Sequence, residues 1–350
     1  MLEPGHKTST FLNEHFQKRV GIGSFNKYEN LFQRTSALIA NSTYFRPQTD
    51  ANLGMLWEQN FRYMFGKGMG KPNPANFFRD LLSHPANYEP NCIAALFWSL
   101  TFAQQNFATT FLPFWSHEER LTGHFISQIL ERSIEFEPYW ASLASGSNSM
   151  LKVWYADIAT YGREKESGAD FGLVIDARLD DGDEFFKVAR VQAKKVPSNN
   201  SAALDLEQMS ALLREESVGF YAFYHDKDKN HWRRPVSIAP ASQFSYRLEK
   251  YKKEALQESI KPVSKQLGRR TFSNVDDDSY DFASFVTFAL ADPGSDHGVV
   301  AKSVPDATRH LVGGNSGLPP VSRLMVLSLR NEINEREWRE NLGEYLSRGE

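Results

Sequence analysis

Cysteine is almost missing from this chain of 350 residues, in which Cys92 is the only one. A single thiol excludes an intramolecular disulfide and a cysteine-based zinc site, and it suits a reducing cytoplasm. Net charge is also small, at −3. A polyanionic partner would therefore have to be met by a local basic patch, because the protein as a whole creates no attractive field for it.

Long hydrophobic runs are absent too. The most apolar helical candidate, CIAALFWSLTFA (92–103), is followed directly by Gln104, Gln105 and Asn106. This run is too short to span a bilayer, which needs about 20 residues, so we expect a buried core helix and no membrane role. The first residues lack the apolar segment of a secretory signal, and we expect a cytoplasmic protein.

Aromatic residues, in contrast, make up 13% of the chain, and the length allows several lobes with ring-rich cores. Apolar spacing predicts helices over 53–65 and 73–84, and we assign residues 1–115 to a helical N-terminal lobe. The region 116–240 is predicted to contain a helix, three strands, a helix and a strand, which implies a mixed sheet flanked by helices. Residues 241–350 are expected to form an α+β accessory region.

The predicted elements of the middle region have clear boundaries. An amphipathic helix begins near Ser116, and Pro138 is expected to lie beyond its end. The predicted strands cover 150–158, 170–176, 185–195, 218–225 and 235–240, with a hairpin turn at 180–183 and a second helix over 204–217. Farther along, we expect a basic helix over 247–261, a strand over 323–329 and a charged terminal helix.

Several short motifs are too weak to assign a function. GKGMGKP (66–72) lacks the glycine spacing and the Ser/Thr of a phosphate-binding loop, and GNSGL (314–318) lacks the last glycine of a nucleophile elbow. His117 and His124 have no evident third ligand, so we expect ordinary histidines. The aspartates at 276–278 more often form a solvated loop than a metal site.

One group of polar residues stands out at the ends of two apolar strands. Gln192 and Lys194 point to the same side of their strand, because side chains alternate between faces, while Ala193 points into the core. If 180–183 forms the hairpin, Asp170 lies at the same end of the neighbouring strand. Carboxylate and amide oxygens suit a hard cation such as Mg²⁺, and a nearby ammonium can stabilise phosphoryl charge. The alternative is a hairpin whose polar ends are merely solvated.

This pattern of an acidic helix followed by D-x(n)-(E/Q)-x-K on a β-hairpin resembles the PD-(D/E)xK, or restriction-endonuclease-like, nuclease superfamily. The resemblance covers about residues 116–240. It implies cleavage of DNA that depends on Mg²⁺ or Mn²⁺. By position, Asp170 and Gln192 would be metal ligands with a possible contribution from the Ala193 carbonyl, and Lys194 would be the catalytic lysine. Gln192 stands where glutamate is commoner, which should weaken metal affinity.

The resemblance extends to EERLTG (118–123), which is similar to the first helix of many bacterial defence and repair nucleases. Either Glu118 or Glu119 could be the helix acid. Ser116 and Glu119 have the spacing of a capping box, which would turn the Glu119 side chain back to the Ser116 N–H. We therefore favour Glu118 as the metal-site residue.

A basic surface is the expected nucleic-acid contact. The stretch 247–270 holds eight Lys/Arg against three Glu, and HDKDKNHWRRP (225–235) adds further positive charge. A charge run is more often just a solvated face. The residues that we expect to contact phosphates are Lys195, Arg233, Arg234, Lys252, Lys253, Arg269 and Arg270.

The sequence thus predicts a restriction-endonuclease-like α/β protein that cuts DNA, with a setting in bacterial anti-phage defence implied by the resemblance alone. Its N-terminal lobe could bind a partner protein or a second copy. The alternative is a non-catalytic nucleic-acid-binding or assembly subunit that keeps the fold, and the neutral Gln192 is the residue that favours this alternative.

Overall fold

The structure is a computed structural model that describes residues 34–35, 37–39, 41–44, 88, 91–112, 116–143, 150–158, 168–178, 184–214, 218–226, 235–257, 269–312, 321–330 and 333–347. The helices predicted over 53–65 and 73–84, the turn at 180–183, the weak motifs at 66–72 and 314–318, and Arg233 and Arg234 lie outside these ranges.

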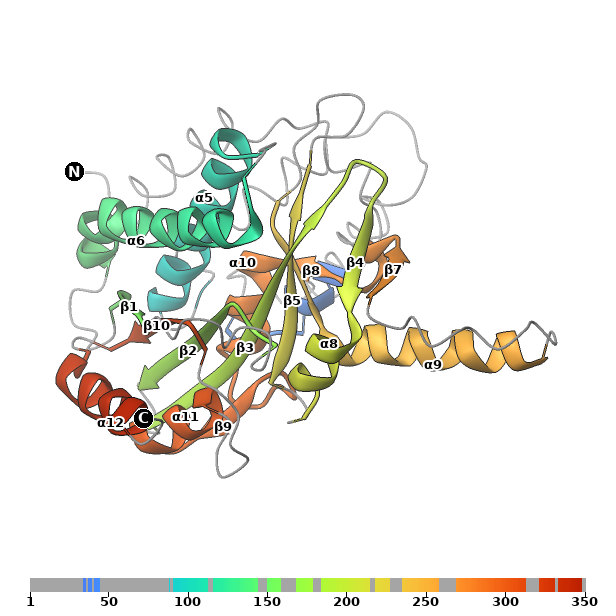
Figure 1. Ribbon diagram of the computed structural model, residues 1–350. Helices are drawn as coiled ribbons and strands as arrows, with labels where there is room; N and C mark the ends of the chain where they lie inside the picture. Colours follow the sequence, from blue (N-terminus) through green and yellow to red (C-terminus); the bar gives the residue numbers. More distant parts are fainter. Residues whose placement is uncertain are drawn as a thin grey trace, which may run out of the picture.

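The described residues form a large mixed sheet with helices on both faces (Figure 1). Its strands follow the order β1-β10-β2-β3-β5-β6-β8, and β9 pairs with the start of β3. In sequence order these strands are β1 (Lys152–Asp157), β2 (Phe171–Arg178), β3 (Glu184–Val196), β5 (Gly219–His225), β6 (Ser237–Pro240), β8 (Tyr280–Asp281), β9 (Val299–Ala301) and β10 (Arg323–Leu329). The expected α/β class, with a mixed sheet between helices, is confirmed.

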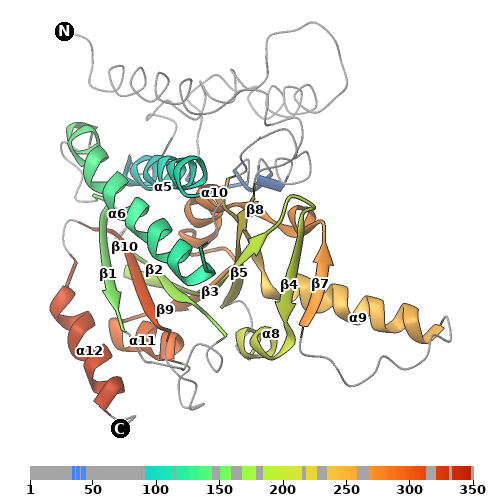
Figure 2. The ribbon, with the colours of Figure 1, turned by 45° about the horizontal axis from the view of Figure 1, so that its top comes forward.

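The helices cover the two faces of this sheet (Figure 2). One face packs against α5 (Asn91–Thr110), α6 (Glu118–Leu143) and α10 (Phe282–Phe285). The other face packs against α8 (Leu206–Leu212), α9 (Ala241–Gln257), α11 (Val304–Val312) and α12 (Glu335–Ser347). None of the described helices is long and apolar enough to cross a membrane.

Alternation along the central strands produces these two cores. On β2, Leu173 and Ile175 join the core beneath α5 and α6, whereas Val174 between them joins the opposite core. On β3, Val191 and Ala193 face α6, and Val188 faces the other side. A central strand covered on both faces is expected to be mostly apolar, yet β3 buries Lys187 and Arg190 as well as Gln192.

Two details of the expected middle region were wrong. Pro138 lies inside α6, which continues to Leu143. The second helix is only α8, and the residues before it form β4 (Ser201–Asp205), which pairs with β7 (Arg269–Ser273) in a separate two-stranded sheet. The Asp205 side chain caps α8 by accepting hydrogen bonds from the Glu207 and Gln208 N–H groups, and this cap fixes where the helix begins.

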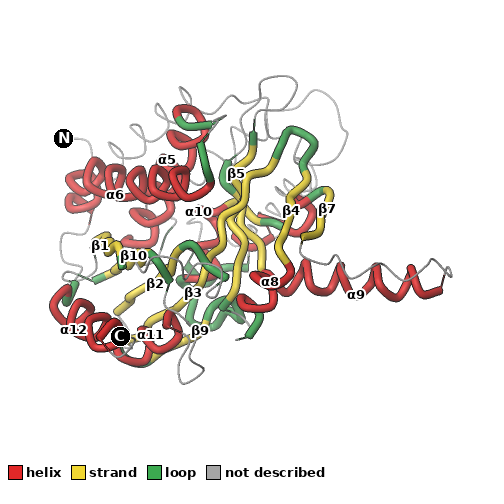
Figure 3. Tube along the Cα trace, viewed as in Figure 1, coloured by secondary structure: helices red, strands yellow, loops and turns green. Residues whose placement is uncertain are grey.

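The C-terminal part of the chain contributes to the same sheet. Strand β10 lies between β1 and β2 (Figure 3). It runs parallel to β2 and antiparallel to β1. Strands β8 and β9 also come from the 241–350 stretch that we expected to form an accessory region. Residues far apart in the sequence are therefore neighbours at the end of β2 where Asp170 lies.

Candidate functional site

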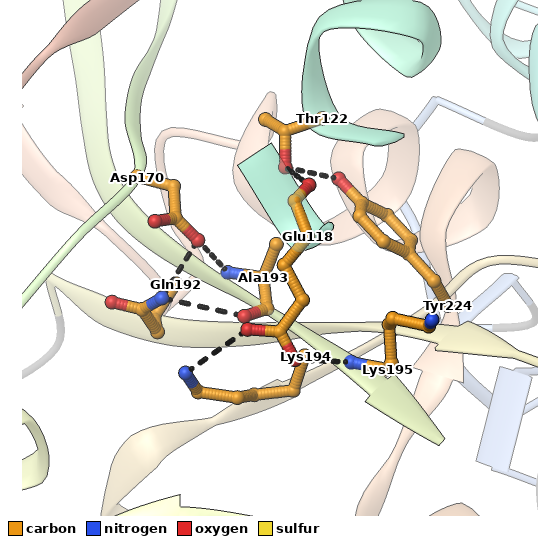
Figure 4. Close-up of polar contacts among 8 residues, drawn as sticks. All are labelled: Glu118, Thr122, Asp170, Gln192, Ala193, Lys194, Lys195 and Tyr224. Carbon is orange, nitrogen blue, oxygen red and sulfur yellow. Dashed lines mark hydrogen bonds and ion pairs between the residues drawn. The ribbon is translucent and has the colours of Figure 1, made fainter. Parts of the chain in front are cut away.

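Asp170 and Gln192 lie opposite one another where β2 begins. The pairing of Phe171 with Val191 places the two residues in register, and the Asp170 N–H donates to the Val191 carbonyl at 2.9 Å. The Gln192 amide Nε2 donates to Asp170 Oδ2 at 2.7 Å, and the Ala193 N–H donates to the same oxygen at 2.7 Å (Figure 4). The pairing of β2 with β3 ends at Phe171 and Val191, so the Ala193 N–H has no carbonyl acceptor on β2. The Asp170 carboxylate accepts its hydrogen bond instead.

The first turn of α6 brings Glu118 to the same end of the sheet. Glu118 Oε1 accepts from the Lys195 N–H at 2.9 Å, and Oε2 lies 3.5 Å from Lys194 Nζ (Figure 4). Lys194 keeps only 12% of its side chain exposed, whereas 36% of the Glu118 side chain is exposed. The structure therefore brings together Glu118, Asp170, Gln192 and Lys194, as the sequence predicted.

A chain of hydrogen bonds connects the Glu118 backbone to β5. Tyr224, on β5, donates its hydroxyl proton to Thr122 Oγ1 at 3.2 Å, and Thr122 donates to the Glu118 carbonyl at 3.0 Å. Burial raises the pKa of Tyr224, so its hydroxyl remains a neutral donor. This chain fixes the first turn of α6 relative to β5 and so fixes the position of the Glu118 backbone.

The capping box expected for Glu119 is not present. Glu119 Oε1 instead pairs with Arg323 Nη2 at 3.1 Å, and 63% of the Glu119 side chain is exposed. Arg323 opens β10, and the preceding residue, Ser322, donates its hydroxyl to the Asp170 carbonyl at 2.8 Å. Sequence reasoning missed Arg323, because no local pattern indicates that β10 pairs with β2.

The residues present fit a hard cation by the chemistry of their donors. Glu118 and Asp170 supply carboxylate oxygens, and Ala193 supplies a main-chain carbonyl. Gln192 is 3% exposed, and its Oε1 has no hydrogen-bond partner among the described residues. A buried amide oxygen without a partner costs free energy, and a bound cation would supply the missing interaction. Among the described residues, no group of three or more His, Cys, Asp or Glu is arranged so that it could hold a metal ion.

The expected phosphate-contacting residues are spread over several elements. Lys195 is exposed beside the site, and its Nζ donates to the Ser116 carbonyl at 3.2 Å. Lys252 and Lys253 lie on α9. Arg269 and Arg270 lie on β7 opposite Asp205 and Leu204, at the end of β4 that leads into α8. The turn that joins β3 to β4 lies at one end of the small sheet, and Arg269 and Arg270 lie at its other end.

The other motif residues have structural contacts. His124 stacks on Phe111 with ring centroids 4.5 Å apart. Asp278 pairs with Arg247 at 2.6 Å, and Asp276 is buried 3.5 Å from His225. These contacts give the aspartate turn a structural role, and the buried Asp276 departs from the expected solvated loop.

No family model matches the chain, and no curated protein or solved structure matches it.

Proposed function

We propose that this protein is a metal-dependent nuclease that hydrolyses phosphodiester bonds in DNA at the site formed by Glu118, Asp170, Gln192 and Lys194. The observation that carries the proposal is the buried Gln192 Oε1, without a partner among the described residues, beside an aspartate and a glutamate at one end of the sheet. The order of α6, β1, β2, β3, β4, α8 and β5 also follows the order expected from the resemblance to PD-(D/E)xK nucleases, with β4 as an additional strand before α8.

Glu118, Asp170 and Gln192 would hold Mg²⁺ or Mn²⁺, with the Ala193 carbonyl as a further donor. When bound, such an ion lowers the pKa of water and stabilises negative charge on a phosphoryl oxygen. Lys194 extends its ammonium group beside Glu118, where it can orient the attacking water and neutralise charge that develops on the phosphate. Asp170 has its Oδ2 oriented by two hydrogen bonds, so little reorganisation is needed when the substrate binds.

The direct test is cleavage of DNA by the purified protein. Linear and supercoiled double-stranded DNA, single-stranded DNA and RNA are incubated with Mg²⁺, with Mn²⁺ and with a chelator. We expect cleavage of DNA with either metal, no cleavage with the chelator, and no cleavage by Asp170→Asn with either metal. Cleavage that continues with the chelator, or in the Asp170→Asn variant, would contradict the proposal.

A non-catalytic nucleic-acid-binding subunit is the second candidate, and the contacts of the acidic residues favour it. Glu118 is engaged by Lys194 and by the Lys195 N–H, while Asp170 accepts two hydrogen bonds through one oxygen. These contacts stabilise both carboxylates without a metal ion. This candidate predicts DNA binding that is equal in Mg²⁺ and in chelator, with no cleavage under either condition.

A further inference from the structure

Arg323 is the one basic residue from the C-terminal strand β10 that the fold brings to the edge of this site. Its neighbour Ser322 is hydrogen-bonded to the Asp170 carbonyl, and its partner Glu119 is the residue next to Glu118. Leu324 pairs with Gly172 in parallel register, which places Arg323 beside Phe171, the first residue of β2. The guanidinium group thus lies beside Glu119 of α6, and on its β1 side it faces the Tyr155 hydroxyl and the Asp157 carboxylate.

The guanidinium group also has unused hydrogen-bonding capacity. Only 13% of the Arg323 side chain is exposed, and its Nη1 is a buried atom with no hydrogen-bond partner among the described residues. A buried cationic donor without an acceptor is costly. A phosphate accepts two parallel hydrogen bonds from a guanidinium group, so one phosphate could satisfy Nη1 and Nη2 together.

Glu119, the acceptor that holds Nη2, can be exchanged at little cost. Its side chain is 63% exposed, and an exposed ion pair contributes little to stability. When Glu119 leaves, its carboxylate regains full hydration. A phosphate that replaces Glu119 would pair with the Arg323 side chain, which is less exposed to solvent than Glu119 is. Glu119 is therefore an exposed and replaceable partner of Arg323, whereas Tyr155 and Asp157 of β1 remain beside the guanidinium group.

We infer that Arg323 binds a backbone phosphate of the nucleic acid bound at the Asp170–Gln192 site, and that Glu119 occupies its place when no nucleic acid is present. This inference rests on the proposed nuclease function. It assigns Arg323 to substrate binding and positioning, with no part in proton transfer. Loss of Arg323 should consequently change KM and the salt dependence of binding much more than kcat.

The experiment compares Arg323→Gln, Arg323→Lys and Glu119→Gln with the wild type. KM and kcat for cleavage of double-stranded DNA are measured in Mg²⁺, and the affinity for a short duplex is measured in chelator over a range of salt concentrations. We expect Arg323→Gln to raise KM about tenfold with kcat within about twofold, and to reduce the log–log salt slope by about 0.9. Arg323→Lys should have a KM between those of the wild type and Arg323→Gln, because lysine retains the charge but cannot donate two parallel hydrogen bonds to one phosphate.

Glu119→Gln is the matched control, because it breaks the same ion pair and leaves the guanidinium group intact. We expect its KM to equal or fall below that of the wild type. Melting temperatures show whether each variant is folded, and if Arg323→Gln does not fold, Arg323→Lys against Glu119→Gln decides the question.

The outcomes separate this inference from the function on which it rests. An unchanged KM and salt slope in the Arg323 variants of an active enzyme would overturn the inference alone. Equal increases in KM for Arg323→Gln and Glu119→Gln would also overturn it, since they would show that the ion pair acts only through structure. DNA binding without cleavage, with the expected loss of slope, would support the phosphate contact and contradict the nuclease. A wild type that neither binds nor cleaves DNA would overturn both.

Discussion

Gln192 donates a hydrogen bond of 2.7 Å from its side-chain amide to the carboxylate of Asp170 across the antiparallel pair β2–β3. The neutral amide provides a hydrogen-bond donor to the buried Asp170 carboxylate without a metal ion. A glutamate at the same position would place two carboxylates in contact. The amide therefore lets this site remain folded when it is empty, and it leaves one oxygen, Oε1, without a partner among the described residues.

Gln192→Glu should make the stability of the protein depend on metal. We expect the free energy of unfolding to fall by about 2 kcal/mol at pH 8 in chelator, because the charged hydrogen bond is lost and two buried negative charges meet. Mg²⁺ should restore the melting temperature, since it binds the folded state only. The measurement is thermal unfolding in chelator and in millimolar Mg²⁺.

The wild type, carried through the same two conditions, is the control and should show a smaller shift with Mg²⁺. An unchanged melting temperature of Gln192→Glu in chelator, together with no response to Mg²⁺, would show that position 192 does not face a metal site.

The contrast between Asp170 and Arg323 shows how much of this site the sequence could predict. The polar ends of two apolar runs were enough to predict that Asp170, Gln192 and Lys194 meet, because a hairpin is a local structure with a fixed register. Arg323 reaches the same place through the pairing of β10 with β2, and a pairing over such a distance in the chain leaves no local pattern. Sequence alone could not indicate that partner.

The details at the two ends of α6 were also predicted incorrectly, because those predictions used local signals alone. The spacing of Ser116 and Glu119 fits a capping box, but the ion pair with Arg323 directs the Glu119 side chain elsewhere. Pro138 was expected to follow the helix, yet α6 continues through it. At Glu119 a tertiary ion pair overrides the local preference, and at Pro138 the helix continues past a residue that usually ends it. Each local preference is worth only a few kcal/mol.

Lys194→Ala should reduce DNA cleavage by about 100-fold while leaving the fold intact. The loss corresponds to one group that stabilises charge in the transition state. Its ion pair with Glu118 is long, at 3.5 Å, so the cost in stability should be below about 1 kcal/mol. Single-turnover cleavage rates and urea unfolding measure the two effects.

Lys302→Ala is the matched control for Lys194→Ala, because it also removes one lysine from the protein. Lys302 is exposed and directly follows β9, which pairs with the other end of β3. This variant should cleave at the wild-type rate. Wild-type cleavage by Lys194→Ala would remove Lys194 from the catalytic site.

Glu118→Gln and Glu119→Gln should separate the two adjacent acids of α6. Glu118→Gln keeps an acceptor for the Lys195 N–H but removes the charge near Lys194, so we expect lost cleavage and a melting temperature within a few degrees of the wild type. Glu119→Gln loses only an exposed ion pair and should keep cleaving. Cleavage rates at several Mg²⁺ concentrations measure the difference, and the opposite pattern would move the metal-site assignment to Glu119.

Asp176, on β2, should make stability fall as pH rises. Burial raises its pKa from 3.8 to about 6, although Arg330, 2.5 Å away, opposes the shift. Because the pKa is higher in the folded state, the folded protein binds more protons than the unfolded chain between these values. The stabilisation is complete below about pH 4 and is lost as the pH rises through 6. The shift of about two pKa units corresponds to about 3 kcal/mol.

Asp176→Asn removes this titration, so the comparison isolates it from every other ionisable group. We expect the free energy of unfolding of the wild type, relative to Asp176→Asn, to be about 3 kcal/mol smaller at pH 8 than at pH 4, so that the wild type is the less stable of the two at the higher pH. Urea unfolding of both proteins at intervals across this range provides the measurement. A difference that stays constant with pH would show that Asp176 keeps its ordinary pKa, and that Arg330 offsets the full cost of burying its charge.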